Sequence, residues 1–130
     1  MKRLVLAAAL AALACTSHAS TVWVMQNSYH FDRTVHYNET NPGLMLESHG
    51  VIVGGYVNSY GKSSTLAGGV WRPIEYGAFK AGVMGGLVTG YKSPFMAAVV
   101  SSYSFGHFSV QLSVVPVKQG VATLQIGWSE

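Results

Sequence analysis

Hydrophobic and polar residues alternate with a period of two along much of the chain. Every second residue from Phe108 to Val114 is apolar, and the residues between them are Ser or Gln. The segment 121–128, VATLQIGW, has a similar alternation. Such a period places one kind of side chain on each face of a β-strand, and no stretch shows a convincing helical period. The pattern therefore predicts an all-β fold whose strands have one apolar face and one small or polar face.

Gly, Pro, Asn and Ser interrupt this alternation at short intervals, as turn residues do between strands. The interruptions predict eight strands, at residues 22–30, 43–48, 51–58, 64–72, 77–89, 95–104, 107–115 and 121–128. Two-residue turns are expected after the second and sixth strands, the longest loop after the first, and a connection at 73–76 after the fourth. Eight strands joined in order predict an antiparallel up-and-down β-barrel. Short turns at one end and longer loops at the other are typical of outer-membrane barrels.

The first residues of the chain have the character of a secretory signal peptide. Two basic residues precede an apolar run at Leu4–Ala14, and the small residues of a cleavage site end at Ala19. We predict a cleaved signal peptide at 1–19 and a single β-barrel domain at 20–130. Cys15, the one cysteine, lies within the signal and leaves a lipoprotein anchor open as an alternative. The mature domain then has no disulfide to stabilise it.

Charged residues make up 10% of the chain, against about 25% in ordinary soluble domains. Part of the formal net charge of +3 belongs to the signal peptide, so the charge predicts no nucleic-acid partner. Aromatic residues gather near the predicted strand ends, as they do at membrane interfaces. We therefore expect an exported monomer in the outer membrane. A small soluble periplasmic barrel is the alternative, because several predicted strands fall short of the about nine to eleven residues of a spanning strand.

The order of several short segments resembles that in the outer-membrane lipid A palmitoyltransferases. These segments are YNETNPGLMLE at 37–47, YVNSY at 56–60, GGVWRP at 68–73, FKAGVMGGLVTG at 79–90, VQLSVVP at 110–116 and LQIGW at 124–128. The resemblance implies an enzyme that transfers an acyl chain from a phospholipid to lipid A, with phospholipid and lipopolysaccharide as its partners. Two positions depart from the family. Its Asp-Ser pair is Asn58-Ser59 here, and neither His30 nor His36 has the spacing of the family's catalytic histidine.

The candidate catalytic residues are expected at one rim of the barrel. His30 and Asp32 lie at the end of the first predicted strand, and Asn58 and Ser59 lie at the end of the third, so a meander brings all four to the same end. Acyl transfer needs an activated hydroxyl, a base and donors for the oxyanion. We assign His30 as the base, Asp32 as its orienting carboxylate, Ser59 as the attacking or assisting hydroxyl and Asn58 as the oxyanion donor. Ordinary turn chemistry is the alternative for the Asn-Ser pair.

An acyl pocket is expected inside the barrel, with Gly82, Met84 and Gly86 in its wall. Glycines there would leave room that side chains otherwise fill in an eight-stranded barrel. No phosphate-binding loop and no metal-ligand spacing occurs, so we expect neither a cofactor nor a metal. The departures from the family keep two other functions open. They are a non-catalytic envelope barrel and a soluble periplasmic barrel that binds an apolar ligand.

Overall fold

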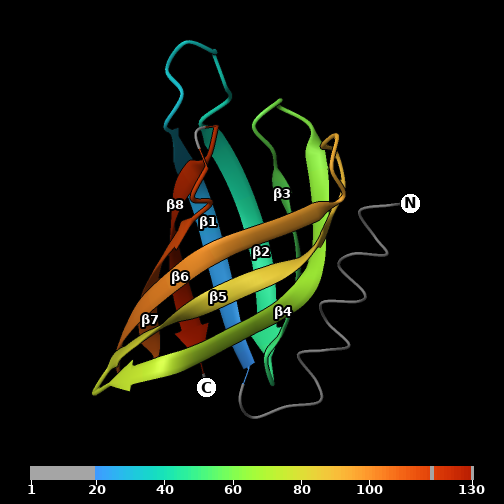
Figure 1. Ribbon diagram of the computed structural model, residues 1–130. Helices are drawn as coiled ribbons and strands as arrows, with labels where there is room; N and C mark the ends of the chain where they lie inside the picture. The colour runs from blue at the N-terminus through green and yellow to red at the C-terminus, as the bar shows by residue number, and fades with distance from the viewer. Residues whose placement is uncertain (1–19, 118, 130) are drawn as a thin grey trace.

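The chain forms a closed antiparallel β-barrel (Figure 1). The computed structural model describes residues 20–117 and 119–129. The eight strands are β1 (Ser20–His30), β2 (Thr40–Ser48), β3 (Val51–Val57), β4 (Ser63–Tyr76), β5 (Phe79–Val88), β6 (Phe95–Phe105), β7 (Phe108–Val114) and β8 (Val121–Ser129). Each strand pairs with the next, and β8 pairs with β1. This confirms the predicted eight-stranded up-and-down barrel, while the predicted signal peptide at 1–19 lies outside the described residues.

The seam between β1 and β8 closes the barrel with close side-chain packing. Trp23 of β1 lies opposite Gly127 of β8, and a Cβ on that glycine would lie 2.6 Å from the indole ring. The hydroxyls of Thr21 and Ser129 lie 2.7 Å apart across the same seam. A side chain at position 127 would therefore displace the buried Trp23 indole.

The two ends of the barrel differ in the length of their connections. Residues 49–50, 77–78 and 106–107 form two-residue turns at the end where β1 begins. Each turn contains a glycine with positive φ, a backbone conformation that favours glycine over other residues. The longer loops lie at the opposite end, seen at the top of Figure 1. We call these ends the short-turn rim and the long-loop rim.

Strand β4 is longer than the sequence predicts. Residues 73–76, expected to form a connection, continue the strand to Tyr76, and the turn to β5 falls at 77–78. The pairing of β4 with β5 shifts register between Trp71 and Ile74. Pro73 has no N–H to donate, so it is tolerated at this irregularity and does not end the strand.

Small and polar side chains point into the barrel in β7 and β8, and apolar side chains point out. Gln111 and Gln125 are 0% and 2% exposed, whereas Leu112, Leu124 and Ile126 are exposed. Large apolar residues are exposed on other strands as well, including Val24, Leu44, Trp71, Val83, Leu87, Phe95, Val99 and Tyr103. The expected two-faced strands are therefore present, with the apolar face outward in β7 and β8.

No helix in the described part of the chain is long and apolar enough to cross a membrane.

A polar cluster fills the barrel interior toward the short-turn rim. Arg72 forms an ion pair with Glu47 and donates to the side chain of Gln111. Trp23 Nε1 donates to Glu47 at 2.9 Å, and Gln111 Nε2 donates to Gln125. These five residues, the internal polar cluster, share this half of the interior with buried apolar side chains such as Ile52 and Val70.

Candidate functional site

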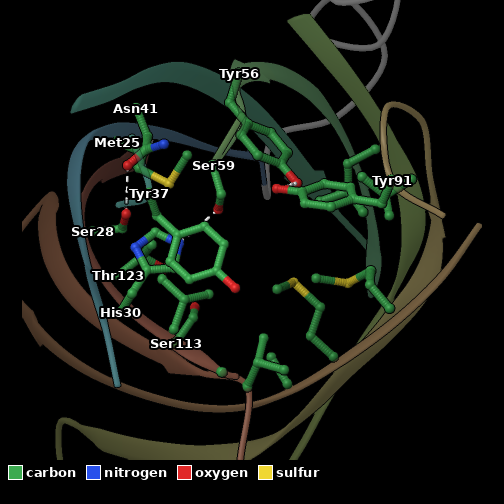
Figure 2. A pocket seen from close by; sticks show the side chains of 18 of the residues that line it. Met25, Ser28, His30, Tyr37, Asn41, Tyr56, Ser59, Tyr91, Ser113 and Thr123 are labelled. Atoms are coloured by element: carbon green, nitrogen blue, oxygen red, sulfur yellow. Dashed lines mark hydrogen bonds between the residues drawn. The ribbon is translucent and has the colours of Figure 1, made fainter. Parts of the chain in front are cut away.

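An internal cavity of about 300 Å³ lies toward the long-loop rim (Figure 2). Side chains of the barrel wall and of the long loops surround it. All four methionines of the described residues line it: Met25, Met45, Met84 and Met96. Methionine is unbranched and polarizable, so it adapts to apolar ligands of irregular shape. The cavity therefore has the wall of a flexible apolar binding site.

The three residues expected in the pocket wall have different places. Met84 lines the cavity, and Gly82 and Gly86 are not among its lining residues. A Cβ on Gly82 would lie 1.8 Å from the Trp71 carbonyl oxygen, and one on Gly86 would lie 2.4 Å from the Ala67 carbonyl oxygen. The two glycines thus allow β4 and β5 to approach closely.

Four tyrosines form an arc across the mouth of the cavity. Tyr37 stacks on the His30 ring with centroids 4.4 Å apart. The ring of Tyr60 follows at 6.3 Å from Tyr37, and Tyr91 follows at 5.8 Å from Tyr60. The hydroxyl of Tyr56 donates to that of Tyr91 at 3.4 Å. This tyrosine arc places aromatic surface where a ligand would enter the cavity.

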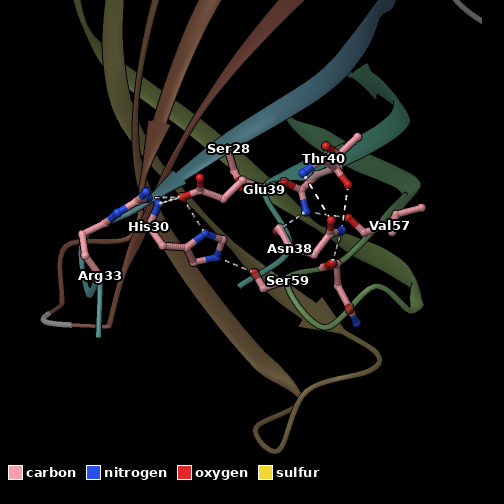
Figure 3. Close-up of polar contacts among 10 residues, drawn as sticks. Ser28, His30, Arg33, Asn38, Glu39, Thr40, Val57 and Ser59 are labelled. Carbon is pink, nitrogen blue, oxygen red and sulfur yellow. Dashed lines mark hydrogen bonds and ion pairs between the residues drawn. The ribbon is translucent and has the colours of Figure 1, made fainter. Parts of the chain in front are cut away.

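His30 and Ser59 meet at this mouth, as the sequence predicted for their rim (Figures 2 and 3). His30 Nε2 lies 2.7 Å from Ser59 Oγ, and both residues line the cavity. The histidine, the last residue of β1, is only 3% exposed. The backbone N–H of Asn38 donates to the Ser59 carbonyl at 2.8 Å and so joins the first long loop to the second. The pair has the geometry of a hydroxyl and its base.

Glu39 is the carboxylate closest to His30, and the sequence analysis missed it. Its Oε1 accepts from the His30 backbone N–H at 3.1 Å and from Arg33 Nη1 at 2.5 Å. The same oxygen lies 3.6 Å from His30 Nδ1 (Figure 3). The N–H of His30 and the guanidinium of Arg33 hold the pKa of the Glu39 carboxyl below its ordinary value, against its partial desolvation. Its signal in the sequence was its position just before β2, where an antiparallel hairpin places it beside the end of β1.

Asp32 lies on the same loop but does not contact the imidazole. Its carboxylate accepts from the backbone N–H and the hydroxyl of Thr34, at 3.0 and 2.5 Å. Both bonds lower the pKa of the Asp32 carboxyl, and the bond from the Thr34 hydroxyl has the larger effect. Asp32 therefore shapes the loop as a local turn residue does.

Asn58 is fully buried, and its side chain organises the loop that carries Ser59. Its Oδ1 accepts from the N–H groups of Tyr60 and Lys62, at 2.9 and 3.0 Å. Its Nδ2 donates to Ser64 Oγ at 2.9 Å and to the Gly90 carbonyl at 3.3 Å. These bonds hold the amide in place beneath the loop. The turn chemistry considered for Asn58 is present, while Ser59 is presented to His30.

Within residues 20–117 and 119–129, no three His, Asp or Glu side chains gather where they could hold a metal ion. The described residues thus define a small β-barrel with a Ser–His pair at the mouth of an internal cavity. No model of a known protein family matches the chain, and no curated protein sequence is similar to it. The resemblance to the lipid A palmitoyltransferases stays a prediction.

Proposed function

We propose that this protein is a lipid acyltransferase of the outer membrane. It transfers an acyl chain from a phospholipid to a lipid A-like acceptor, as its resemblance to the lipid A palmitoyltransferases implies. The observation that carries the proposal is the 2.7 Å contact between His30 Nε2 and Ser59 Oγ at the mouth of a methionine-lined cavity. A base, a hydroxyl and a space for an apolar chain are thereby combined at one rim.

The barrel exterior supports the membrane location. Apolar residues such as Val83, Val99 and Leu124 are exposed around it, and exposed apolar surface of this extent is not typical of soluble monomers. Trp71 and Trp128 add aromatic side chains to the same exterior. The interior holds buried glutamines, Gln111 and Gln125, together with an apolar cluster that includes Ile52, so the exposed apolar exterior carries the argument for the membrane.

The reaction proceeds in two steps on these residues. Ser59 Oγ attacks the ester carbonyl of the phospholipid, its proton passes to His30 Nε2, and the lysophospholipid leaves with that proton. A hydroxyl of the acceptor then attacks the acyl-serine, and its proton passes through His30 to Ser59 as the new ester leaves. Both steps need the same 2.7 Å contact, and the cavity holds the acyl chain throughout.

The test is the mass spectrum of lipid A from Gram-negative cells that express the native protein, Ser59→Ala or no protein. The native protein should add one acyl chain, and Ser59→Ala should not. Ser63→Ala is the matched control, because this exposed serine lies at the same rim and does not line the cavity. If the native barrel is folded in the outer membrane and lipid A is unchanged, the acyltransferase proposal is wrong for this acceptor.

A non-catalytic lipid-binding barrel is the second candidate. It is favoured by Asn58, whose amide donates to Ser64 and Gly90 and is therefore not free to bind an oxyanion. Methyl NMR of the methionines would separate the two candidates. Shifts on addition of a fatty acid, together with unchanged lipid A, would support binding without turnover.

A further inference from the structure

The ring of His30 has one buried nitrogen without a partner. For Nε2 to accept the Ser59 proton, the other nitrogen, Nδ1, must carry the imidazole hydrogen. Nδ1 is buried and has no hydrogen-bond partner among the described residues. An unpaired buried donor costs free energy and leaves the tautomer unfixed. The site therefore needs an acceptor beside Nδ1.

Glu39 is placed to be that acceptor, but its oxygen is already occupied. Its Oε1 lies 3.6 Å from Nδ1, beyond hydrogen-bond distance. The same oxygen accepts from Arg33 at 2.5 Å and from the His30 backbone N–H at 3.1 Å. A small movement of the carboxylate toward the ring would complete the contact, and the Arg33 bond opposes that movement.

Arg33 lies at the surface, where its guanidinium contacts both Glu39 and the Tyr29 ring. Its side chain is 59% exposed, and its guanidinium carbon lies 5.0 Å from the centre of the Tyr29 ring. The bond to Glu39 is a surface ion pair, a class that contributes little to stability. Arg33 can therefore release the carboxylate without disturbing the barrel.

We infer that Glu39 is the positioning residue of His30 and that Arg33 restrains it. When Glu39 accepts from Nδ1–H, the imidazole is fixed with Nε2 free to take the Ser59 proton. When Arg33 holds the carboxylate, this contact is lengthened and the pair is less reactive. The inference rests on the proposed function, because it names the carboxylate of the same site.

Substitutions of the two residues should have opposite effects on the ring of His30. Removing the carboxylate with Glu39→Ala should leave Nδ1 without an acceptor and shift the imidazole toward the tautomer with its hydrogen on Nε2. Arg33→Gln should free Glu39 and strengthen the Nδ1–H contact. A purely structural role in the loop would not give opposite signs at the ring of His30.

The first measurement is NMR of 15N-histidine-labelled protein folded in detergent micelles. We expect the His30 signals to report a hydrogen on Nδ1 in the native barrel, a shift toward the Nε2–H tautomer in Glu39→Ala and a more downfield Nδ1–H proton in Arg33→Gln. Glu75→Ala is the matched control, because Glu75 pairs with Lys80 beside the 77–78 turn at the short-turn rim. Heat-dependent gel mobility checks that each barrel is folded.

The second measurement is the rate at which a fluorophosphonate labels Ser59. Ser59 Oγ bonds to phosphorus, the P–F bond breaks, fluoride leaves, and the proton passes to His30 Nε2. Glu39→Ala should slow labelling by roughly 10- to 100-fold, within what a positioned base contributes, and Arg33→Gln should speed it. Asp32→Ala tests the rival carboxylate, which contacts Thr34 instead.

Each outcome is decisive. Unchanged His30 signals in Glu39→Ala, or an effect of Asp32→Ala in its place, overturn the inference. If the native protein is not labelled, the NMR signals alone decide. Neither measurement uses a lipid acceptor, so an unchanged lipid A spectrum would reject the proposed function without touching the role of Glu39.

Discussion

Asn58→Asp tests a position where the chain differs from the lipid A palmitoyltransferases it was predicted to resemble, because the variant introduces the Asp-Ser pair of those enzymes. If a carboxylate at this position served the chemistry, the variant would be more active. The contacts of Asn58 predict the opposite. Its Nδ2 donates to Ser64 Oγ and to the Gly90 carbonyl, and a carboxylate has no hydrogen to donate to either.

The magnitude follows from these two lost bonds and from burial. The Ser64 hydroxyl already donates to the Thr89 carbonyl at 2.6 Å, so it cannot turn toward a carboxylate without losing that bond. A new carboxylate oxygen would face the Gly90 carbonyl oxygen at a site that is 0% exposed. Two lost bonds and an unpaired buried acceptor give a loss of about 2–5 kcal/mol in unfolding free energy.

Urea unfolding of the barrel in micelles measures this loss, with the fluorophosphonate rate as its functional readout. Burial raises the pKa of the new carboxyl above its unfolded value, so the folded state binds the proton more tightly. The variant should therefore approach native stability below about pH 4 and become less stable as the pH rises through the raised pKa. A variant that is as stable as the native protein at pH 7 and labels faster would refute this account of Asn58.

Three further predictions follow from other parts of the barrel. Arg72→Met should leave Glu47 buried without its cation and lower the free energy of unfolding in urea by about 3–5 kcal/mol. The double variant Arg72→Met, Glu47→Met should recover most of that loss, and additive losses from the two substitutions would contradict this. The Glu39 carboxylate should keep its bonds from Arg33 and the His30 N–H at neutral pH and lose them as the pH falls through its lowered pKa. Amide NMR as a function of pH measures this transition, and a transition midpoint at or above the ordinary pKa of a glutamate would contradict the prediction. A fatty acid should shift the methyl signals of the cavity methionines, and unchanged signals would argue against an apolar ligand there; these residues are Met25, Met45, Met84 and Met96.

The fold could be predicted because the pattern that specifies each strand lies within that strand's own sequence. A period of two marks strands, and in β7 and β8 the alternation also separates the outward from the inward face. The extent of β4 could not be predicted in this way. A proline usually ends a strand. Pro73 is tolerated within β4 because the register of β4 against β5 shifts there, and only the pairing of the two strands defines that shift.

The site was predictable only as far as topology determines it. His30 ends the first strand and Ser59 comes just after the third, so a meander brings them to one rim whatever the loops do. The carboxylate depends on loop conformation. Asp32 is two residues from His30 but bonds to Thr34, whereas Glu39 is nine residues away in the chain and reaches the backbone of His30. Proximity in sequence favoured the wrong neighbour for this contact.

The division of the interior into a filled half and a cavity would orient a bound acyl chain. An eight-stranded barrel has room for little beyond its own side chains, and here the internal polar cluster and buried apolar residues such as Ile52 fill the half toward the short-turn rim. The inward positions near the other rim include small residues such as Ser28, Ala98 and Ser113, which line the cavity. An acyl chain that enters from the long-loop rim would meet the Arg72–Glu47 pair below it, so its ester end would stay at the mouth. That end is where Ser59 and His30 lie 2.7 Å apart, so the same packing that closes one half of the barrel would hold the reacting carbonyl beside the hydroxyl.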